Sequence, residues 1–493
     1  GGTLTTNRVT KGAGTGLFNF NGGTLKANAA NATFMTGLTN AFVYSGGAKI
    51  DTAGFDITIG QALLAPNGSG VSSIAVAGGG AGYVDTPVVV VSGGSGTGAT
   101  AVATVVNGVV TGFTITNPGT GYVDGDVLTV TLHGGGATTA ASAGTVVFSG
   151  NSSGGLTKSG TGVLTLSAVN TYTGGTTILD GTLALGATGV LADAGAVTVD
   201  GSGAVFSLGV NNETVAAVTL TNGSIESSTG VLTASSYDLR NGAVTAILDG
   251  SAAVTKSTSG AVTVSAANTY TGGTTVTGGT YLVQNTAGSG TGTGQVTVQS
   301  GARFGGTGSV VTAADRNISI NSGASLQVGK LGEFGDSAGQ SFTLQNSGTG
   351  IITLQGTLEF DIVENFGGDS NLASPLATND VLVLRSDSAI VLGGTLKVTD
   401  VNETSAGEFT AWQEFDTWQL IDWSNVVVGG NSSATKFTGG FGVLELPDLD
   451  AAFKWAVTTD LNGLYIQVVA VPEPGRMMLL LLGVAGLCLR RRR

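Results

Sequence analysis

Residues 157–185 read TKSGTGVLTLSAVNTYTGGTTILDGTLAL, and residues 255–283 read TKSTSGAVTVSAANTYTGGTTVTGGTYLV. The second segment follows the first at an offset of 98 residues, and 17 of the 29 aligned positions are identical. A shorter Gly-Thr-Leu unit recurs along the chain, beginning at Gly2, Gly23, Gly181, Gly356 and Gly394. Repetition of this kind predicts a solenoid, in which each structural unit contacts mainly its neighbours.

The local period within the repeats is two. Leu164 and Leu166 alternate with Val163 and Thr165, which is the pattern of a strand with one face in a core. Turn pairs such as Asp180-Gly181 punctuate the strands, and no helical period appears before the last 22 residues. Short strands repeated this often stack best as coils of a parallel β-helix, where each coil bonds to the next and only the ends expose edges.

The composition fits an extracellular structural protein better than a nucleic-acid or lipid-binding one. Only 10% of the 493 residues are charged and 84 are glycine, against about 25% charged residues in an average domain. The 471 residues before Pro472 hold 14 basic and 31 acidic groups, a net charge of −17. Such a body repels nucleic acid and anionic lipid. The single cysteine, Cys488, leaves this body without a disulfide.

A second repeat lies at 71–148, where Gly-Tyr-Val-Asp occurs at 82–85 and again at 121–124. It predicts a small strand-rich module inserted in, or stacked on, the solenoid. From about residue 331 large side chains return, and all four tryptophans fall between 412 and 455, which predicts terminal coils and a cap over the open edge. We therefore expect five parts. N-terminal coils with a truncated start occupy 1–70, the Gly/Tyr-repeat module 71–148, and the main β-helix 149–330. The terminal coils with an aromatic-rich β cap occupy 331–470, and a sorting tail occupies 471–493.

The tail has three ordered parts. Val471-Pro472-Glu473-Pro474 is followed by 13 apolar residues, Met477 to Leu489, and then by Arg490, Arg491, Arg492 and Arg493. As a helix the apolar run spans roughly 20 Å, whereas a bilayer core is about 30 Å thick, so the run is a poor permanent anchor. The arginines are costly to move through lipid and favour an orientation with the body outside the cytoplasm.

This tail resembles the PEP-CTERM sorting signal of Gram-negative and related bacteria, over residues 472–493 only. The resemblance implies an exosortase-like membrane enzyme that recognises Pro472-Glu473-Pro474 and processes the tail during export, after transient inner-membrane attachment. A plain tail anchor is the alternative interpretation.

The stretches at about 156–185 and 254–283 resemble the autotransporter-associated β-strand repeat of passenger-like regions in exported bacterial proteins. The resemblance implies a right-handed parallel β-helix and implies no enzyme. Because the sorting tail stands where an autotransporter carries its membrane barrel, we expect a different export route.

Residues with catalytic chemistry are few. His133 is the only histidine and cannot form a zinc cluster with Cys488, so a Ser-His-Asp site would rest on that residue alone. The glycine-rich run 288–294 lacks the Lys-Ser/Thr and the helix of a phosphate-binding loop, and a turn is the better interpretation. Glu359 and Asp361 share one strand face, and paired acids of this kind can hydrolyse glycosides.

No cofactor motif is present, although Asp85, Asp124 and Asp126 are candidates for structural calcium. Trp412, Trp418 and Trp423 could form a sugar-binding platform, but packing in the core and cap is the better interpretation because apolar residues surround them in the sequence.

The sequence therefore predicts a non-enzymatic surface or matrix protein, exported to the cell surface or extracellular matrix of a Gram-negative-type bacterium. Its expected partners are an exosortase-like enzyme and exopolysaccharide or neighbouring cell-surface components, with no nucleic acid. Two alternatives stay open: a β-helix polysaccharide lyase or glycoside hydrolase, and a glycan-binding adhesin.

Overall fold

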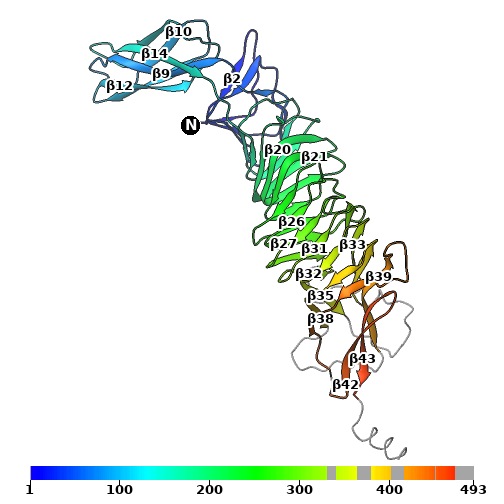
Figure 1. Cartoon of the computed structure of the whole chain (residues 1–493). Helices are drawn as coiled ribbons and strands as arrows, with labels where there is room; N and C mark the ends of the chain where they lie inside the picture. Colours follow the sequence, from blue (N-terminus) through cyan, green and yellow to red (C-terminus); the bar gives the residue numbers. More distant parts are fainter. Residues whose placement is uncertain (1, 330–339, 363–378, 401–415, 450, 472–493) are drawn as a thin grey trace, which may run out of the picture. The chain divides into compact units, whose positions relative to one another are not determined.

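The computed structural model describes residues 2–329, 340–362, 379–400, 416–449 and 451–471 (Figure 1). All regular structure in these ranges is β-strand, and they contain no helix. The chain divides into two compact units, the first formed by Gly1–Asp238 with Thr245–Ile247 and the second by Leu239–Val244 with Leu248–Arg493. The division falls within β21 (Val231–Leu239) and β23 (Ile247–Asp249).

The first unit is a stack of parallel coils held by three strand ladders. One ladder runs through β1 (Thr3–Thr6), β3 (Thr24–Ala27), β6 (Ala48–Asp51), β15 (Leu156–Ser159), β17 (Thr176–Ile178), β19 (Val197–Gly209) and β20 (Glu213–Ser227). The second runs through β4 (Asn31–Met35), β7 (Ile57–Ile59), β16 (Val163–Leu166), β18 (Gly181–Leu185) and the later part of β19. The third joins β2 (Leu17–Phe20), β5 (Asn40–Val43) and β8 (Leu63–Leu64). The predicted parallel β-helix is confirmed.

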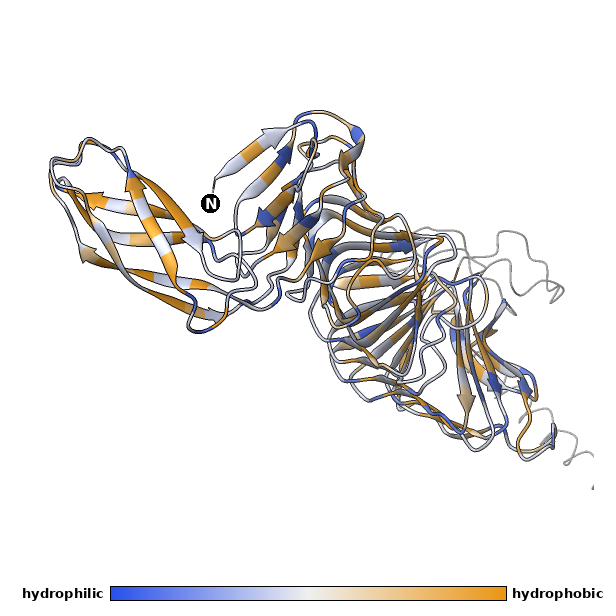
Figure 2. Ribbon diagram, turned by 90° about the horizontal axis from the view of Figure 1, so that it is seen from above, coloured by the Kyte–Doolittle hydropathy of each residue, from blue (hydrophilic) through white to orange (hydrophobic). Residues whose placement is uncertain are grey.

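Alternate residues of each coil strand enter the core, as the period of two predicts. Leu164 and Leu166 of β16 are fully buried and stack in register on Leu183 and Leu185 of β18, while Val163 and Thr165 are only half-buried. Hydrophobic and hydrophilic residues also alternate along coil strands in Figure 2, which is coloured by hydropathy. Apolar ladders of this kind bury a continuous core that no single coil could form alone.

The stack is interrupted by an inserted module. β6 pairs directly with β15, so Ala48 and Leu156 are register partners although 107 residues separate them in the chain. Likewise β7 pairs with β16. The chain therefore leaves the coils after β8, builds separate sheets, and returns to continue the same ladders.

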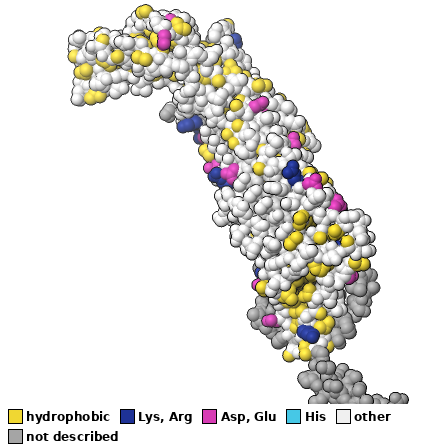
Figure 3. All heavy atoms as spheres, in the orientation of Figure 1, with side chains coloured by type: hydrophobic (Ala, Val, Ile, Leu, Met, Phe, Trp, Pro, Cys, Tyr) yellow, Lys and Arg dark blue, Asp and Glu magenta, His cyan; other side chains and the backbone are white. Residues whose placement is uncertain are grey.

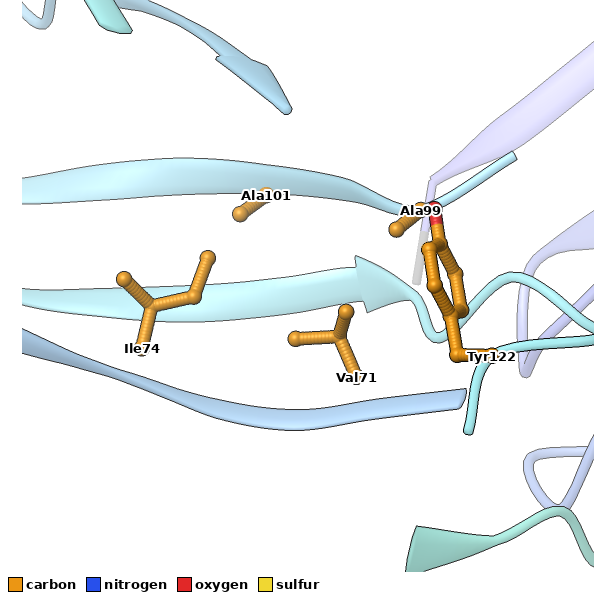
Figure 4. Close-up of a cluster of buried hydrophobic side chains, with 5 residues drawn as sticks. All are labelled: Val71, Ile74, Ala99, Ala101 and Tyr122. Atoms are coloured by element: carbon orange, nitrogen blue, oxygen red, sulfur yellow. The ribbon is translucent and has the colours of Figure 1, made fainter. Parts of the chain in front are cut away.

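The inserted module is a two-layer antiparallel β-structure. Its larger sheet has the order β12 (Val109–Asn117), β11 (Thr100–Val106), β10 (Val88–Gly93) and β13 (Leu128–His133), and its smaller sheet pairs β9 (Ser69–Gly78) with β14 (Ser142–Gly150). Two apolar clusters lie within it. The first contains Val71, Ile74, Ala99, Ala101 and Tyr122 (Figure 4), and the second contains Tyr83, Ala103, Val110 and Ala141.

The second unit continues the parallel arrangement in two long ladders. One runs through β22 (Gly242–Val244), β25 (Ala261–Val264), β27 (Gly279–Val283), β29 (Ala302–Gly306), β32 (Ser325–Val328), β35 (Thr357–Ile362), β38 (Thr395–Asp400) and β41 (Val443–Glu445). The other runs through β24 (Val254–Lys256), β26 (Thr274–Val276), β28 (Val296–Val298), β31 (Ile318–Ile320), β34 (Ile352–Leu354), β37 (Ile390–Leu392) and β40 (Phe437–Gly439).

A third sheet of this unit changes direction at its end. β30 (Ser309–Ala314), β33 (Ser341–Ser347), β36 (Val381–Ser386) and β39 (Thr417–Val426) are parallel, whereas β43 (Gly463–Ala470) and β42 (Phe453–Thr459) add antiparallel strands. The antiparallel pair covers the edge of β39, which blocks further parallel stacking there. The predicted sorting helix lies outside the described residues.

Candidate functional surfaces and the repeat core

The asparagine of the NTYT motif clamps three successive coils. Asn170 is buried; its Oδ1 accepts a hydrogen bond from Leu63 N (2.8 Å) in the preceding coil, and its Nδ2 donates to Val190 O (2.8 Å) in the following one. Asn268 repeats the arrangement, accepting from Leu248 N (2.9 Å) and donating to Gly290 O (2.8 Å). A side-chain amide both donates and accepts, so it satisfies backbone groups on either side of its own coil.

The remaining residues of the motif close the corner. Tyr172 is buried and its hydroxyl lies 2.7 Å from Thr176 Oγ1, and Tyr270 and Thr274 form the same contact at 2.6 Å. A Cβ on Gly174 would lie 2.4 Å from the backbone carbon of Gly154, so only glycine fits this approach. Asn170, Tyr172 and Gly174 of the repeated NTYTGGTT segment (residues 170–177) are therefore explained by packing within and between coils.

Each repeat also buries a lysine. Lys158 is 0% exposed. Its Nζ lies within hydrogen-bond distance of four acceptors: Thr52 Oγ1 (3.1 Å) and the carbonyl oxygens of Ser159 (3.1 Å), Gly160 (2.6 Å) and Asp180 (2.9 Å). Burial lowers the pKa of this ammonium to about 8, against the opposing charges of Asp180 and Asp51.

Lys256, at the same place in the second repeat, is also 0% exposed and donates to the carbonyl oxygens of Thr258 and Gly278. Each ammonium group therefore donates to several turn carbonyls that point inward. Removing it would leave these acceptors without a donor, which costs free energy of folding.

Glu213 is a buried carboxylate that sequence reasoning missed. Glu213 is 2% exposed and accepts hydrogen bonds from Val190 N (2.9 Å) and Leu191 N (3.3 Å). Burial raises the pKa of its carboxyl group to about 7, although these backbone donors favour the charged form. Glu213 follows Asn211-Asn212 at the end of a turn, and nothing in this local sequence distinguishes it from a solvated acid.

Trp418 and Trp423 of β39 pack inside the second unit. Trp418 and Trp423 are at most 2% exposed; Trp423 stacks on Phe437 at 4.8 Å and its Nε1 donates to Asp460 O (3.0 Å). Trp418 meets Trp455 edge to face at 5.8 Å. Their rings are therefore not placed on an exposed glycan platform, and Trp412 lies outside the described residues.

The calcium candidates are not gathered into one group. Asp126 fastens its own loop, since its carboxylate accepts from Ser95 Oγ (2.7 Å), Ser95 N (3.1 Å) and Val123 N (3.0 Å). Asp85 accepts from Thr86 N (2.7 Å), and Asp124 is exposed. Over the described ranges no three His, Cys, Asp or Glu side chains are arranged to hold a metal ion.

Glu359 and Asp361 do share one face of β35, as their spacing predicts, and they lie among other charges. Arg303 of β29 forms a 3.0 Å salt bridge with Glu359, and Lys397 of β38 is the register partner of Glu359. Burial raises the pKa of the Asp361 carboxyl group, helped by the charge of Glu359 and opposed by Lys397. Charged residues of three coils thus meet on one face of the second unit.

The remaining sequence candidates have local roles. His133 ends β13, where its Nε2 lies 3.1 Å from Thr131 Oγ1. The glycine-rich run folds inward, because Ser289 and Thr291 are buried and Ser289 Oγ donates to Gly292 O (2.6 Å). It forms a largely buried turn, in which the hydroxyl groups of Ser289 and Thr291 lie 3.3 Å apart and face the interior.

A hollow of about 320 Å³ lies beside β1 and β2. Phe18, Phe20, Asn19 and Asn21 contribute to its lining, and it gathers no ionisable side chain. Charged groups are sparse on the face drawn in Figure 3 as well. Within the described part of the chain no helix has the length and apolar character to cross a membrane.

Of the tail, only Val471 is among the described residues; Pro472, Glu473, Pro474 and Arg490 to Arg493 lie outside them. The sorting interpretation therefore rests on the sequence.

Comparison with known families gives one match. Residues 156–185 and 254–280 match the model of the passenger-associated-transport-repeat. They form β15 to β18 in one case and β24 to β26 with the start of β27 in the other, which are the coils that carry the asparagine clamp and the buried lysine. No curated protein matches the chain. The repeats indicate a passenger-like, exported surface protein.

Proposed function

We propose that this chain is a structural or adhesion protein of the bacterial cell surface or extracellular matrix, sorted there by its C-terminal tail. The single observation that carries the proposal is the repeat match on coils whose recurring buried asparagine, lysine and tyrosine serve stacking. Asn170, Lys158 and Tyr172 are consumed by contacts within and between coils. These contacts fix the outer surface of the coils without disulfides. The proposed role is structural and adhesive and includes no catalysis.

The partners that fit this surface are exopolysaccharide and neighbouring cell-surface components. Threonine, serine and asparagine on the outward positions of the coils offer hydroxyl and amide groups to neutral glycans. A net charge of −17 before residue 472 disfavours nucleic acid and anionic lipid.

The tail supplies the address. Pro472-Glu473-Pro474 is proposed as the recognition motif of an exosortase-like enzyme, with the apolar run as a transient inner-membrane segment and the arginines on its cytoplasmic side. A run of 13 residues is shorter than the about 20 that span a bilayer, which favours processing over permanent anchoring.

Deletion of residues 472–493 tests the sorting claim in the native host. We expect the deletion, and replacement of Pro472-Glu473-Pro474 by alanines, to remove the protein from the surface and matrix fractions. Replacement of Asp448, an exposed-loop acid outside the tail, by alanine is the control and leaves the distribution unchanged. Equal surface levels of all forms would contradict the sorting claim. If the protein recovered from the surface still carries its tail, the tail acts as a plain anchor.

A second candidate function is cleavage of a matrix polysaccharide. It is favoured by one observation: Glu359 and Asp361 lie on one face with Lys397 of the next strand in the ladder and Arg303 of the strand two steps before. Incubation of extracted matrix glycan with the purified protein tests it. Loss of depolymerisation in Glu359→Gln with Asp361→Asn supports it, and the absence of any cleavage by the unaltered chain rejects it.

A further inference from the structure

The larger sheet of the inserted module has an outer face without lysine, arginine, aspartate or glutamate, and His133 is its one ionisable side chain. We call it the valine–threonine face and define it by Val88, Val90, Val102, Thr114, Thr131 and His133. The strand register places His133, Val88, Val102 and Thr114 side by side across all four strands. Val88 is 65% exposed and Val102 is 47% exposed, so nothing in the described chain covers the centre of this face.

The opposite face of the same sheet already has its partner. Ala101, Val89 and Phe113, which alternate with the outer residues, pack in the clusters between the two layers of the module. An antiparallel sheet with one buried side normally shows polar and charged residues on the other, and charged side chains are the usual guard against unwanted sheet contacts. Here the outer positions are valine, threonine and one histidine, so this charged guard is missing from the face.

The charge pattern selects the occupant. Residues 71–148 contain no lysine, arginine or glutamate, and their three acids, Asp85, Asp124 and Asp126, lie in loops at the strand ends. Without lysine or arginine, and with His133 as the one ionisable side chain, the face lacks the cluster of cations that binds an anionic polymer. Without an exposed aromatic ring among its defining residues it lacks the flat platform on which sugars and apolar tips anchor.

A second copy of this chain fits the same constraints. Two copies with a net charge of −13 repel each other over most of their surfaces, but meeting through this face buries no lysine, arginine, aspartate or glutamate. We propose that the valine–threonine face is a homotypic contact, formed by the same patch on both copies as in an isologous dimer.

The area makes the contact weak by itself. Four strands spaced about 4.8 Å apart, with about six residues each at about 3.3 Å per residue, give roughly 400 Å² per copy. A standard stable interface buries about 800 Å² per partner. The pairing therefore acts where many copies are held on one surface, because tethering raises the effective concentration. This deepens the adhesive part of the proposed function and is independent of its sorting part.

Sedimentation equilibrium of the full chain over a wide concentration range tests the contact. The double variant Val88→Lys with Val102→Lys places two charges on each copy in the middle of the face. We expect its association constant to fall at least tenfold, the equivalent of about 1.4 kcal/mol. Val210→Lys is the matched control: Val210 is 70% exposed in a turn of the same unit, and its variant retains the association of the unaltered chain.

A milder double variant protects the test against misfolding. Val88→Thr with Val102→Thr keeps the β-branched shape and weakens association several-fold while the far-ultraviolet spectrum stays unchanged. A monomeric unaltered chain, or lysine variants that associate as strongly as the control, would overturn the proposal.

A third outcome would also overturn the proposal. If the unaltered chain is monomeric and binds matrix glycan, and the variants of the face lose that binding, the face is a glycan-binding surface. Surface levels of the same variants, measured in the host, separate this outcome from failure of sorting, because the face variants retain the tail.

Discussion

Replacing the buried Lys158 by methionine tests whether its ammonium group holds the corner of the repeat. Methionine keeps the length and apolar stem of the side chain but cannot donate to the turn oxygens. The Ser159 carbonyl keeps a donor, because Thr52 N bonds to it at 3.0 Å. The Gly160 and Asp180 carbonyls rely on the ammonium, at 2.6 and 2.9 Å. The variant therefore leaves two partly buried acceptors without their donor.

The expected loss follows from those two acceptors. A buried polar group left without a partner costs about 1–3 kcal/mol, and removal of the buried charge returns part of this, so we expect a net loss of about 2–4 kcal/mol in local stability. Amide hydrogen exchange measures it at Leu179, whose N–H donates to Lys158 O. The predicted loss corresponds to exchange that is about 30- to 700-fold faster.

Lys49→Met is the matched control, since Lys49 lies on the exposed side of the neighbouring β6. A pH series adds a second readout. The folded pKa of Lys158 is about 8, below its ordinary 10.5, so between these values the unfolded chain holds a proton that the folded chain has released. Stability of the unaltered chain rises with pH through this window, and the Lys158→Met substitution removes the rise. Exchange rates within threefold of the Lys49→Met control at every pH would refute the reasoning.

Three further predictions concern the first unit. Asn170→Ala removes both sides of the asparagine clamp and should lower local stability by about 2–3 kcal/mol, measured by exchange of the Leu63 amide; unchanged protection would contradict the clamp. Gly174→Ala places a Cβ 2.4 Å from the Gly154 backbone, whereas Gly150→Ala meets nothing within 4 Å; proteolysis of residues 150–180 in urea should separate the two, and equal resistance argues against the close approach. Glu213 has a folded pKa of about 7, above its ordinary 4.5, so its contribution is complete below pH 4.5 and is lost as pH rises to 7; Glu213→Gln should remove this slope, and an unchanged urea midpoint profile from pH 4.5 to 8 would disprove it.

The repeated stretches and their alternation predicted the coils well. Leu164 and Leu166 lie inside because a period of two on a repeated unit has few other solutions. The second repeat at 71–148 also carried structural information, since its two tyrosines, Tyr83 and Tyr122, each anchor one of the two module clusters.

Other features depend on contacts that the sequence does not display. Lys158 has the sequence context of a solvated charge in a Thr-Lys-Ser strand, and it is buried because carbonyls from Gly160 and Asp180 converge on its Nζ. The pairing of β6 with β15 bridges the whole inserted module, and no local pattern sets a register across such a distance. The pKa of Glu213 is raised by burial, which depends on packing against Val190 and Leu191, residues that lie more than 20 positions earlier in the chain.

Labelling of intact cells tests the central claim, that the coils are displayed outside the cell, most directly. Cys488 is the only native cysteine; in a Cys488→Ser background, Val210→Cys places one thiol on an exposed turn of the first unit. A membrane-impermeant maleimide applied to intact cells should label this thiol as fully as it does after lysis, while a cytoplasmic thiol protein in the same cells stays unlabelled. Labelling that appears only after lysis would contradict display at the surface.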